Sequence, residues 1–399
     1  MNKIDLLVAY PDNWTGAEAA RKDTAEQVFY VSPAVASFEF SEDGLLLTLN
    51  AGDFEESALL EAAQTLLQRC ADAASRTKDE VLEEHEGEMT PADDVYATLV
   101  ERGDAHFNMP GIPVFEGDFL HLLNALDAIF LAYAREIGCV EQAYPTTVPT
   151  QSLLANGYLK SFPQHARLVG TIHQDFDSLT AIAENPGDFT EVEDVDKLMS
   201  GHAEVLSPTV CYHCFERHRD ADLSRDKSLI TAIAQCHRHE GRNTEGLTRL
   251  RTYTMREIIF FGDAEFVREW QHAIMDKCKA LLSEFGMRFR VAAASDPFFA
   301  TSATQKKDFQ RMFRLKYELQ ALLPEEDRWI SVASFNNHQS TLVDAYSIAQ
   351  PEVGVGQSGC FGVGYERLAY ALVSQKGFDT VHWPDAIRKH LPKSQANLE

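Results

Sequence analysis

Hydrophobic and polar positions along the first part of the chain predict a small α/β unit. Two stretches rich in aromatic and β-branched residues, 28–33 and 37–51, have the composition of strands. They precede an Ala- and Leu-rich segment, 54–75, that reads as a helix. Residues 76–95 are charged and nearly free of large apolar groups, which predicts a polar helix end running into a linker.

The rest of the chain has the pattern of a sheet flanked by helices. Apolar residues spaced i, i+3 and i+4 predict amphipathic helices at 118–137 and 264–286. Residues 229–240 begin apolar and end polar, and 248–261 are rich in Thr, Tyr, Ile and Phe. The segment between them, 241–247, holds two glycines and an asparagine, so the three pieces predict strand, turn and strand.

A second strand-to-helix connection is predicted near the C-terminus. Gly362 and Gly364 precede the apolar, helical stretch 368–373, and glycines permit a tight turn and the close approach of a ligand. Arg367 then falls in the first helical turn, where a cation opposes the helix dipole, so we expect an anionic partner for it. A lone Gly-x-Gly is weak by itself; its position downstream of the Arg-rich hairpin gives it weight.

Alternation of side chains along the predicted hairpin gathers polar groups on one sheet surface. If the register of the two strands matches, the shared face carries Arg238, Glu240, Arg249, Arg251, Tyr253 and Glu257. Guanidinium groups grip phosphate oxygens, an aromatic ring stacks on a base, and a carboxylate accepts from the adenine amino group. The set therefore suits a bound nucleotide. The alternative is a solvated hairpin of mixed charge.

Composition narrows the class of protein. With 399 residues the chain is long enough for two domains, and we place them at 1–95 and 96–399. A net charge of −25 disfavours a protein that wraps nucleic acid. No run is long and apolar enough to span a bilayer, and the first residues lack a signal-peptide pattern, so we expect a cytoplasmic location. Seven scattered cysteines are no disulfide framework.

Three residues have side chains that could share a zinc ion: Cys211, Glu257 and Cys360. Two thiolates and a carboxylate with one open position are typical of a substrate-binding rather than a structural zinc. Spacing alone does not identify this trio, because buried free cysteines commonly just pack. Cys211 and Cys214 form a competing Cys-x-x-Cys signal, although no second such pair exists to complete a four-cysteine site.

The motifs together resemble a known family. Residues 236–240 with 248–258 look like motif 2 of a class II aminoacyl-tRNA synthetase core, and 359–368 look like motif 3. Further segments match in order, and over roughly 95–395 the succession is similar to the amino acid:[carrier protein] ligases, relatives of the zinc-dependent seryl-tRNA synthetases of methanogens. These segments are 102–107, 144–148, 157–163, 295–298, 316–319 and 333–339. The resemblance implies an α/β (α+β) fold with an antiparallel sheet flanked by helices, beside the small N-terminal α/β domain.

The resemblance also implies roles for individual residues. A zinc ion would be held by Cys211, Glu257 and Cys360, and its open position would take the α-amino group of an amino acid. Arg238 would hold the α-phosphate and carboxylate, Glu240 and Tyr253 the adenine, and Arg367 the γ-phosphate. Further ATP contacts and substrate contacts would come from Arg249 and Arg251, and from Glu257, Ser334 and Asn336, respectively. The three residues expected to be catalytic are Arg238, Glu240 and Arg367.

The implied reaction has two steps. A small amino acid, glycine or alanine in this family, reacts with ATP and Mg²⁺ to give an aminoacyl-adenylate. The phosphopantetheine thiol of a holo carrier protein then takes the aminoacyl group as a thioester. Residues 328–334 lack the carboxylate that seryl enzymes use there, so the Mg²⁺ ligands are unassigned. Pro145 lies in the motif 1 region, which implies a homodimer.

Other functions stay open at the level of sequence. A seryl-type tRNA synthetase would need a basic or coiled-coil arm for tRNA, and residues 1–95 are acidic and too short for a long helical hairpin, which makes tRNA an unlikely partner. A ligase that passes its adenylate to another acceptor in natural-product assembly and a non-enzymatic module that keeps the fold are two further alternatives. Ligases of the family that the motifs resemble lack an N-terminal unit as long as 1–95, so the role of that unit is open.

Overall fold

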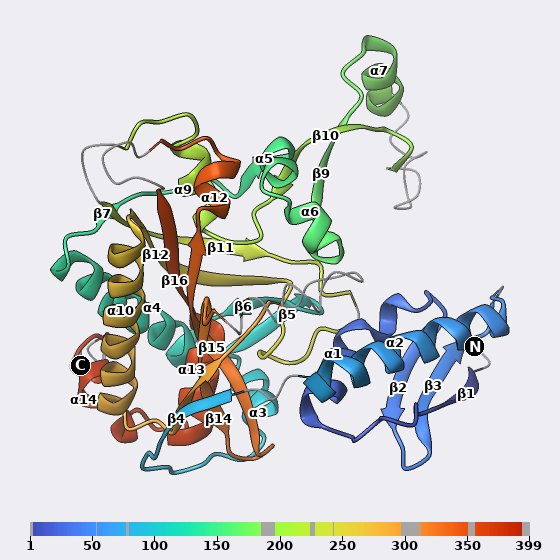
Figure 1. Cartoon of the computed structure of the whole chain (residues 1–399), viewed down its shortest axis with the longest axis horizontal. Coiled ribbons are helices and arrows are strands. Elements are labelled where there is room, and N and C mark those ends of the chain that lie inside the picture. The colour runs from blue at the N-terminus through green and yellow to red at the C-terminus, as the bar shows by residue number, and fades with distance from the viewer. Residues whose placement is uncertain are drawn as a thin grey trace.

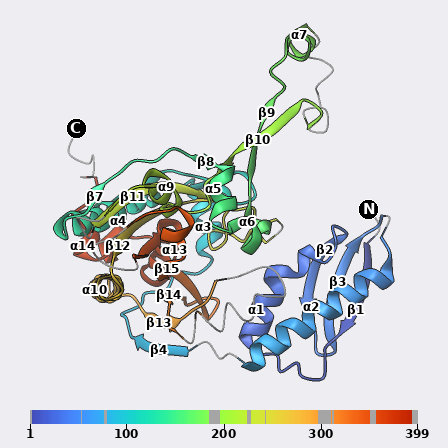
Figure 2. The ribbon, with the colours of Figure 1, turned by 45° about the horizontal axis from the view of Figure 1, so that its top comes forward.

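The computed structural model describes residues 3–52, 54–76, 80–184, 196–223, 228–241, 243–296, 310, 313–349 and 356–392. The chain folds into an N-terminal unit that lies beside a larger body, and an arm that ends in α7 (Phe176–Glu184) projects from that body (Figures 1 and 2). No described helix combines the length and the apolar character that crossing a membrane requires.

The N-terminal unit packs two helices on a three-stranded antiparallel sheet in the order β1-β3-β2. The Ala- and Leu-rich segment is helical as predicted, and its apolar face packs on Leu45, Leu47 and Leu49 of the central strand. The elements are β1 (Lys3–Ala9), α1 (Glu18–Gln27), η1 (Val28–Tyr30), β2 (Val35–Phe40), β3 (Gly44–Asn50) and α2 (Glu56–Arg76).

Two strand predictions in this unit need correction. Residues 28–33 are no strand: they open with the 3-10 turn η1, which continues α1 and buries Val28 completely in the core of the unit. Packing therefore overrides the β propensity of that stretch. Residues 37–51 hold a hairpin rather than one strand, because the chain turns at Ser41, whose amide donates to the carbonyl of Gly44 over 2.9 Å.

The charged segment after α2 also differs from its prediction. Within it, β4 (Glu80–His85) is a strand at the edge of the large sheet, antiparallel to β13 (Phe289–Ala293). The His85 ring stacks on Phe289 with centroids 4.4 Å apart, and Glu83 pairs with Lys279 over 3.1 Å. Charged side chains are common on edge strands, which the composition rule for linkers does not recognise. The boundary near residue 95 stays a proposal.

The body is built on an eight-stranded sheet in the order β4-β13-β14-β15-β16-β12-β11-β7. All neighbours are antiparallel except β11 and β7. The predicted hairpin is confirmed: β11 and β12 are antiparallel, with Cys236 opposite Tyr253. The strands not yet given are β7 (Val140–Glu141), β11 (Ser228–His237), β12 (Thr252–Gly262), β14 (Lys316–Leu323), β15 (Arg328–Gln339) and β16 (Gln357–Gly364).

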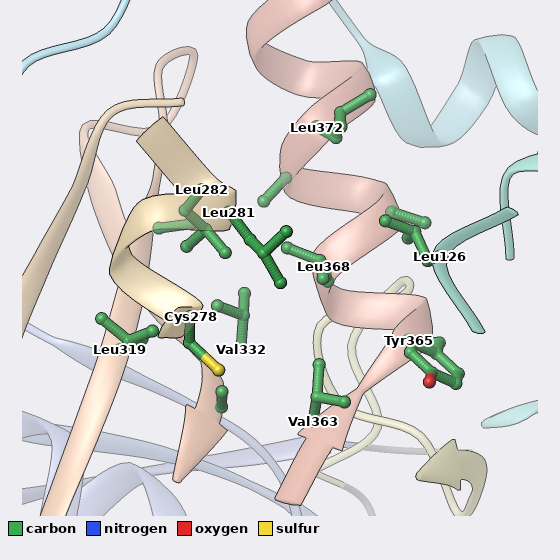
Figure 3. Close-up of a cluster of buried hydrophobic side chains, with 14 of the residues drawn as sticks. Leu126, Cys278, Leu281, Leu282, Leu319, Val332, Val363, Tyr365, Leu368 and Leu372 are labelled. Carbon is green, nitrogen blue, oxygen red and sulfur yellow. The ribbon is translucent and has the colours of Figure 1, made fainter. Parts of the chain in front are cut away.

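Three long helices cover the sheet. α4 (Gly117–Glu136) and α10 (Ala264–Glu284) confirm the two amphipathic predictions, and α13 (Tyr365–Lys376) begins directly after Gly364 as the Gly-x-Gly pattern predicts. Figure 3 shows how Leu281 of α10 and Leu368 of α13 meet over the strands, with Leu126 of α4 beside them. This core holds the strands that carry the polar face described below.

Shorter elements complete the body and the arm. Strands β8, β10 and β9 form a separate antiparallel sheet that leads out to α7. The remaining described elements are α3 (Val95–Glu101), β5 (Ala105–Met109), β6 (Ile112–Phe115), β8 (Thr147–Pro149), α5 (Thr150–Ala155), α6 (Tyr158–Ser161), η2 (Pro163–His165), β9 (Leu168–Ile172), β10 (Met199–Leu206), α9 (Cys211–Arg217), α12 (Thr341–Ala345), η5 (Thr380–His382) and α14 (Asp385–Arg388).

An ion pair with a buried arginine ties the hairpin to α4. Arg256 of β12 donates to Asp127 over 2.7 and 3.1 Å, and Asp127 also accepts from the Tyr365 hydroxyl over 2.8 Å. Replacing Asp127 with alanine should lower the free energy of unfolding by about 3 kcal/mol, because it leaves a buried guanidinium without its partner. Urea unfolding measures the loss.

The matched control for that substitution is Glu141→Ala, which breaks the exposed pair between Glu141 and Arg135. Exposed pairs contribute little, so this variant should unfold almost as the parent does. Equal losses in the two variants would contradict a supporting role for the pair of Arg256 and Asp127.

Candidate active site

Three neighbouring strands line up the residues on which the candidate site is built. Glu257 of β12 lies opposite Gly362 of β16, and Gly362 lies opposite Ser334 of β15. On the same two strands Cys360 lies opposite Asn336. A β-carbon at Gly362 would come within 2.7 Å of the Met255 side chain and 3.4 Å of Glu257, so the glycine leaves room for these two side chains on the sheet.

The thiol and carboxyl groups of Cys211, Glu257 and Cys360 meet at this row. One potential ligand atom from each lies within 4.8 Å of the other two, and all three residues are buried. Cys211 reaches the sheet from the first turn of α9. One carboxylate oxygen of Glu257 accepts from the Thr209 hydroxyl over 2.6 Å and from the Val210 amide over 3.1 Å. Its other oxygen is buried without a hydrogen-bond partner.

The two thiols and the carboxyl group have shifted acidities. A hydrogen bond between the thiols raises the pKa of Cys211 and lowers that of Cys360. The Cys360 sulfur also lies 3.5 Å from the Asn336 amide nitrogen and 3.5 Å from Nε2 of His338, which favours its thiolate. Burial, and then the neighbouring Cys360, raise the pKa of Glu257 to about 8.

This donor set fits zinc. Two sulfurs and one carboxylate oxygen are ligands that zinc accepts, and three protein ligands leave one position open. The unpartnered oxygen of Glu257 is the observation that supports the fit, because a buried carboxylate oxygen normally has a partner. Cys214 stands outside the group: it is completely buried among Phe215, Phe261 and Tyr346, so its role is packing.

Four of the side chains predicted to bind ATP lie together at the end of the hairpin where a loop joins β11 to β12. The Arg238 guanidinium lies 5.6 Å from the centre of the Tyr253 ring, and its Nε donates to the carbonyl of Pro208 over 3.1 Å. Glu240 accepts from Arg249 over 2.9 Å. The four residues share a region as predicted, but only Tyr253 lies in a strand; Arg238, Glu240 and Arg249 belong to the loop between β11 and β12.

The other two arginines reach the same region from different directions. Arg251 donates to the carbonyl of Gly241 over 2.7 Å, and its Nε is buried without a partner. Arg367 donates to the carbonyls of Thr248 and Ser331 over 2.6 and 3.3 Å, and the anionic partner that we expected for it stays a prediction. Burial, and then the neighbouring Arg249, lower the pKa of Arg367, and an anion bound beside it would stabilise its charged form.

Ser334 and Asn336 lie beside the thiol and carboxyl group. The Asn336 amide donates to the Ser334 hydroxyl over 3.2 Å as well as to the Cys360 sulfur. The structure therefore brings these two predicted substrate residues to the row that holds the third, Glu257, and places them on the strand next to Cys360. Their role toward a substrate remains a prediction.

The supporting roles of several residues are not evident from the sequence. His338 and Thr209 contact the thiol and carboxyl group from segments distant along the chain. Glu366, buried at the start of α13, accepts from the Thr254 amide with both oxygens, over 2.8 and 2.9 Å, and burial raises its pKa to about 7. The Glu-Arg pair in the motif draws attention to this position, but only the fold shows that it fixes α13 to β12.

Comparison with known proteins shows that part of this chain is similar to class II synthetases. Residues 195–376 match the tRNA synthetase class II core domain (G, H, P, S and T). Two relatives from Bradyrhizobium diazoefficiens, amino acid–[acyl-carrier-protein] ligases 1 and 2, are each 28% identical to this chain. The alignments span 265 and 306 residues, or 65% and 74% of this chain and 79% and 87% of the relatives.

Seryl enzymes are similar as well. The type-2 serine–tRNA ligase of Methanopyrus kandleri is 23% identical over 287 residues, 68% of this chain and 54% of the relative. Among solved structures, M. kandleri SerRS in complex with A. aeolicus tRNASec has a TM-score of 0.71 at 19% identity, covering 99% of this chain and 80% of that one. The predicted fold class and the predicted family resemblance are thereby confirmed, as is the expectation of an enzyme of the ligase type.

Proposed function

From the premise that this chain resembles the amino acid–[acyl-carrier-protein] ligases, we propose that it activates a small amino acid with ATP and transfers it to the phosphopantetheine thiol of a carrier protein. One observation carries the proposal: Glu257, which meets Cys211 and Cys360, lies on the same hairpin as the arginine-rich face. Tyr253 and Glu257 point to the same side of β12, about 13 Å apart along the strand. An amino acid joined to a nucleotide spans such a distance.

Each side chain has a part in this arrangement. Arg238 would neutralise the α-phosphate and orient the substrate carboxylate, since a guanidinium fork contacts two oxygens at once. Tyr253 and Glu240 would bind the adenine, and Arg367 the γ-phosphate. Activation of this kind needs positioning and charge neutralisation more than covalent chemistry from the protein. Mg²⁺ would accompany the triphosphate, with ligands yet to be assigned.

Zinc would be held by Cys211, Glu257 and Cys360. The ion would act as a Lewis acid and bind the neutral α-amino group at the coordination position that the protein leaves open. Hydroxy acids and simple carboxylates lack that group, so the site would select amino acids. Asn336 and Ser334, next to Cys360, would line the place of a short side chain, which supports glycine or alanine as the substrate.

The charge of the N-terminal unit argues against tRNA as the acceptor. Residues 1–95 hold 21 acidic and six basic residues. Affinity for nucleic acid comes largely from cations on phosphates, so this unit is a poor surface for RNA. A seryl-type tRNA ligase remains the second candidate because M. kandleri SerRS shares the fold over 99% of this chain. A ligase with another acceptor in natural-product assembly is the third.

Pyrophosphate exchange with each of the common amino acids tests the first step, and acceptor assays test the second. We expect exchange with glycine or alanine, and aminoacylation of a holo carrier protein but not of the apo form, which lacks the thiol. Transfer to tRNA alone would identify the seryl-type function. Exchange with no amino acid would reject the proposal altogether.

The affinity for zinc should rise with pH. The pKa values of Cys211 and Glu257 are raised, so in the metal-free protein both groups hold protons near neutral pH that a metal must displace. We expect the affinity to increase about tenfold or more per pH unit between about pH 6 and pH 8. Chelator competition measures this slope, and calorimetry in two buffers counts the protons released. An affinity independent of pH would contradict this ligand set.

Two further expectations belong to the same proposal. A homodimer, formed around the segment that contains Pro145, follows the class II resemblance, and analytical ultracentrifugation tests it. A cytoplasmic location suits an enzyme that consumes ATP and keeps seven free cysteines, since thiols persist in reducing compartments.

A further inference from the structure

The N-terminal unit contacts the loop that joins β11 and β12. The approach is made by the C-terminal end of α1, where Glu26 lies. The backbone carbonyl of Glu26 accepts from the Asn243 side chain over 3.0 Å, and the Glu26 carboxylate lies 3.3 Å from the Arg249 guanidinium. Main chain and side chain of one residue thus hold both halves of the loop.

The contact continues directly to a residue of the proposed adenine site. Arg249 stands between two carboxylates: it contacts Glu26 through one terminal nitrogen and Glu240 through Nε over 2.9 Å. Glu240 in turn lies 3.9 Å from Nδ1 of His165. The side chains of Glu26, Arg249 and Glu240 are only 17%, 25% and 9% exposed, so solvent screens these charges less than it screens a surface pair.

The position of Glu26 on α1 is electrostatically unfavourable unless a cation lies nearby. A carboxylate in the last turn of a helix is unfavourable against the helix dipole, and the last turn of α1 holds no basic residue to offset it. Arg249 supplies the compensation from another part of the chain. Against the effect of burial, Glu26 and Glu240 raise the pKa of Arg249, as expected for a cation shared by two carboxylates.

A shared guanidinium fixes where the Glu240 carboxylate can lie. If Arg249 paired only with Glu240, the two side chains could move together as the loop moves. Because Arg249 also pairs with Glu26 of α1, Glu240 is held in place relative to the sheet. A site whose groups are already in place loses less conformational freedom when a ligand binds. The N-terminal unit thereby helps to hold a residue of the proposed nucleotide site in place.

We propose that Glu26 is a positioning residue for ATP: through Arg249 it holds Glu240 and the β11–β12 loop in the arrangement that receives the adenine. The proposal deepens the proposed function and rests on it for the identity of the nucleotide. It assigns to the N-terminal unit the task of bracing the nucleotide site, beyond any contact with an acceptor.

The test compares Glu26→Gln with Glu39→Gln, an exposed carboxylate on β2 of the same unit. Glu26→Gln keeps the size of the side chain and the backbone bond to Asn243 but removes the charge. We expect the Kd and KM for ATP to rise roughly tenfold, as is common for coupled sites, with kcat for pyrophosphate exchange nearly unchanged. Hydrogen exchange in peptides covering 243–251 should become faster. Glu39→Gln should change none of these quantities.

A double substitution separates positioning from general stability. If Glu26 acts through Arg249, Glu26→Gln should add little to the effect of Arg249→Gln on the Kd for ATP. The proposal is overturned if Glu26→Gln leaves ATP affinity and loop exchange unaltered, or if it lowers kcat and melting temperature while the Kd stays constant. ATP binding and hydrogen exchange need neither amino acid nor acceptor, so they remain informative even if no amino acid supports pyrophosphate exchange.

Discussion

Replacing Cys360 with serine is expected to abolish zinc binding and amino acid activation together. Cys360 provides one of only three side chains in the group, and a serine hydroxyl does not replace a thiolate on zinc. Changes outside a metal's own ligands already cost about 10- to 100-fold in affinity or activity, so the loss of a ligand should exceed 100-fold. Metal content and pyrophosphate exchange, measured on the same preparation, give both values.

The matched control for this substitution is Cys214→Ser. Cys214 is also completely buried and lies one helical turn from Cys211, yet it stands outside the ligand group. Its replacement should lower the melting temperature without changing the zinc content. Full zinc occupancy in Cys360→Ser, or equal loss of zinc in both variants, would show that the ligands are other residues.

Replacing Arg238 with alanine should lower the rate of activation about 100- to 1,000-fold, the usual cost of removing a group that stabilises developing charge. The site would lose the cation nearest the reacting phosphate together with its contact to the Tyr253 ring. Arg238→Lys keeps the charge but loses the planar fork, so its rate should fall between those of the alanine variant and the parent. Single-turnover formation of the adenylate measures the step.

Zinc content should stay normal in both Arg238 variants, because Arg238 is no member of the ligand group. Arg268→Ala, on the exposed face of α10, serves as the control for loss of an arginine far from the hairpin and should retain full activity. An alanine variant of Arg238 with ordinary kinetics would remove this residue from the mechanism.

Regular patterns of apolar and polar residues correctly predicted the parts of the fold that local sequence determines. Spacing of apolar residues located α4 and α10, and strand composition with a turn between predicted the antiparallel pair of β11 and β12. Where packing decides, the patterns failed. Val28 belongs to a helical turn because the core of the N-terminal unit accepts it there, and β4 is a strand because an edge of the large sheet was available to it.

The candidate site shows the same division. Glu257 follows from strand alternation, whereas Cys211 and Cys360 were linked to it only by resemblance, since no spacing rule connects a helix start with two strands. The contacts that His338 makes with Cys360 and Thr209 makes with Glu257 join segments that are separated along the chain, so they are visible only in the fold. The contact between Glu26 and Arg249 likewise requires the folded arrangement of two units.

Zinc-edge X-ray absorption on the purified chain, without and with glycine or alanine, tests the central claim most directly. The account predicts one zinc per chain with two sulfurs at about 2.3 Å and lighter atoms at about 2 Å. Addition of the amino acid should change the shell of lighter atoms and leave the sulfurs in place. A chain that binds no zinc, or whose zinc has no sulfur neighbours, would contradict the account.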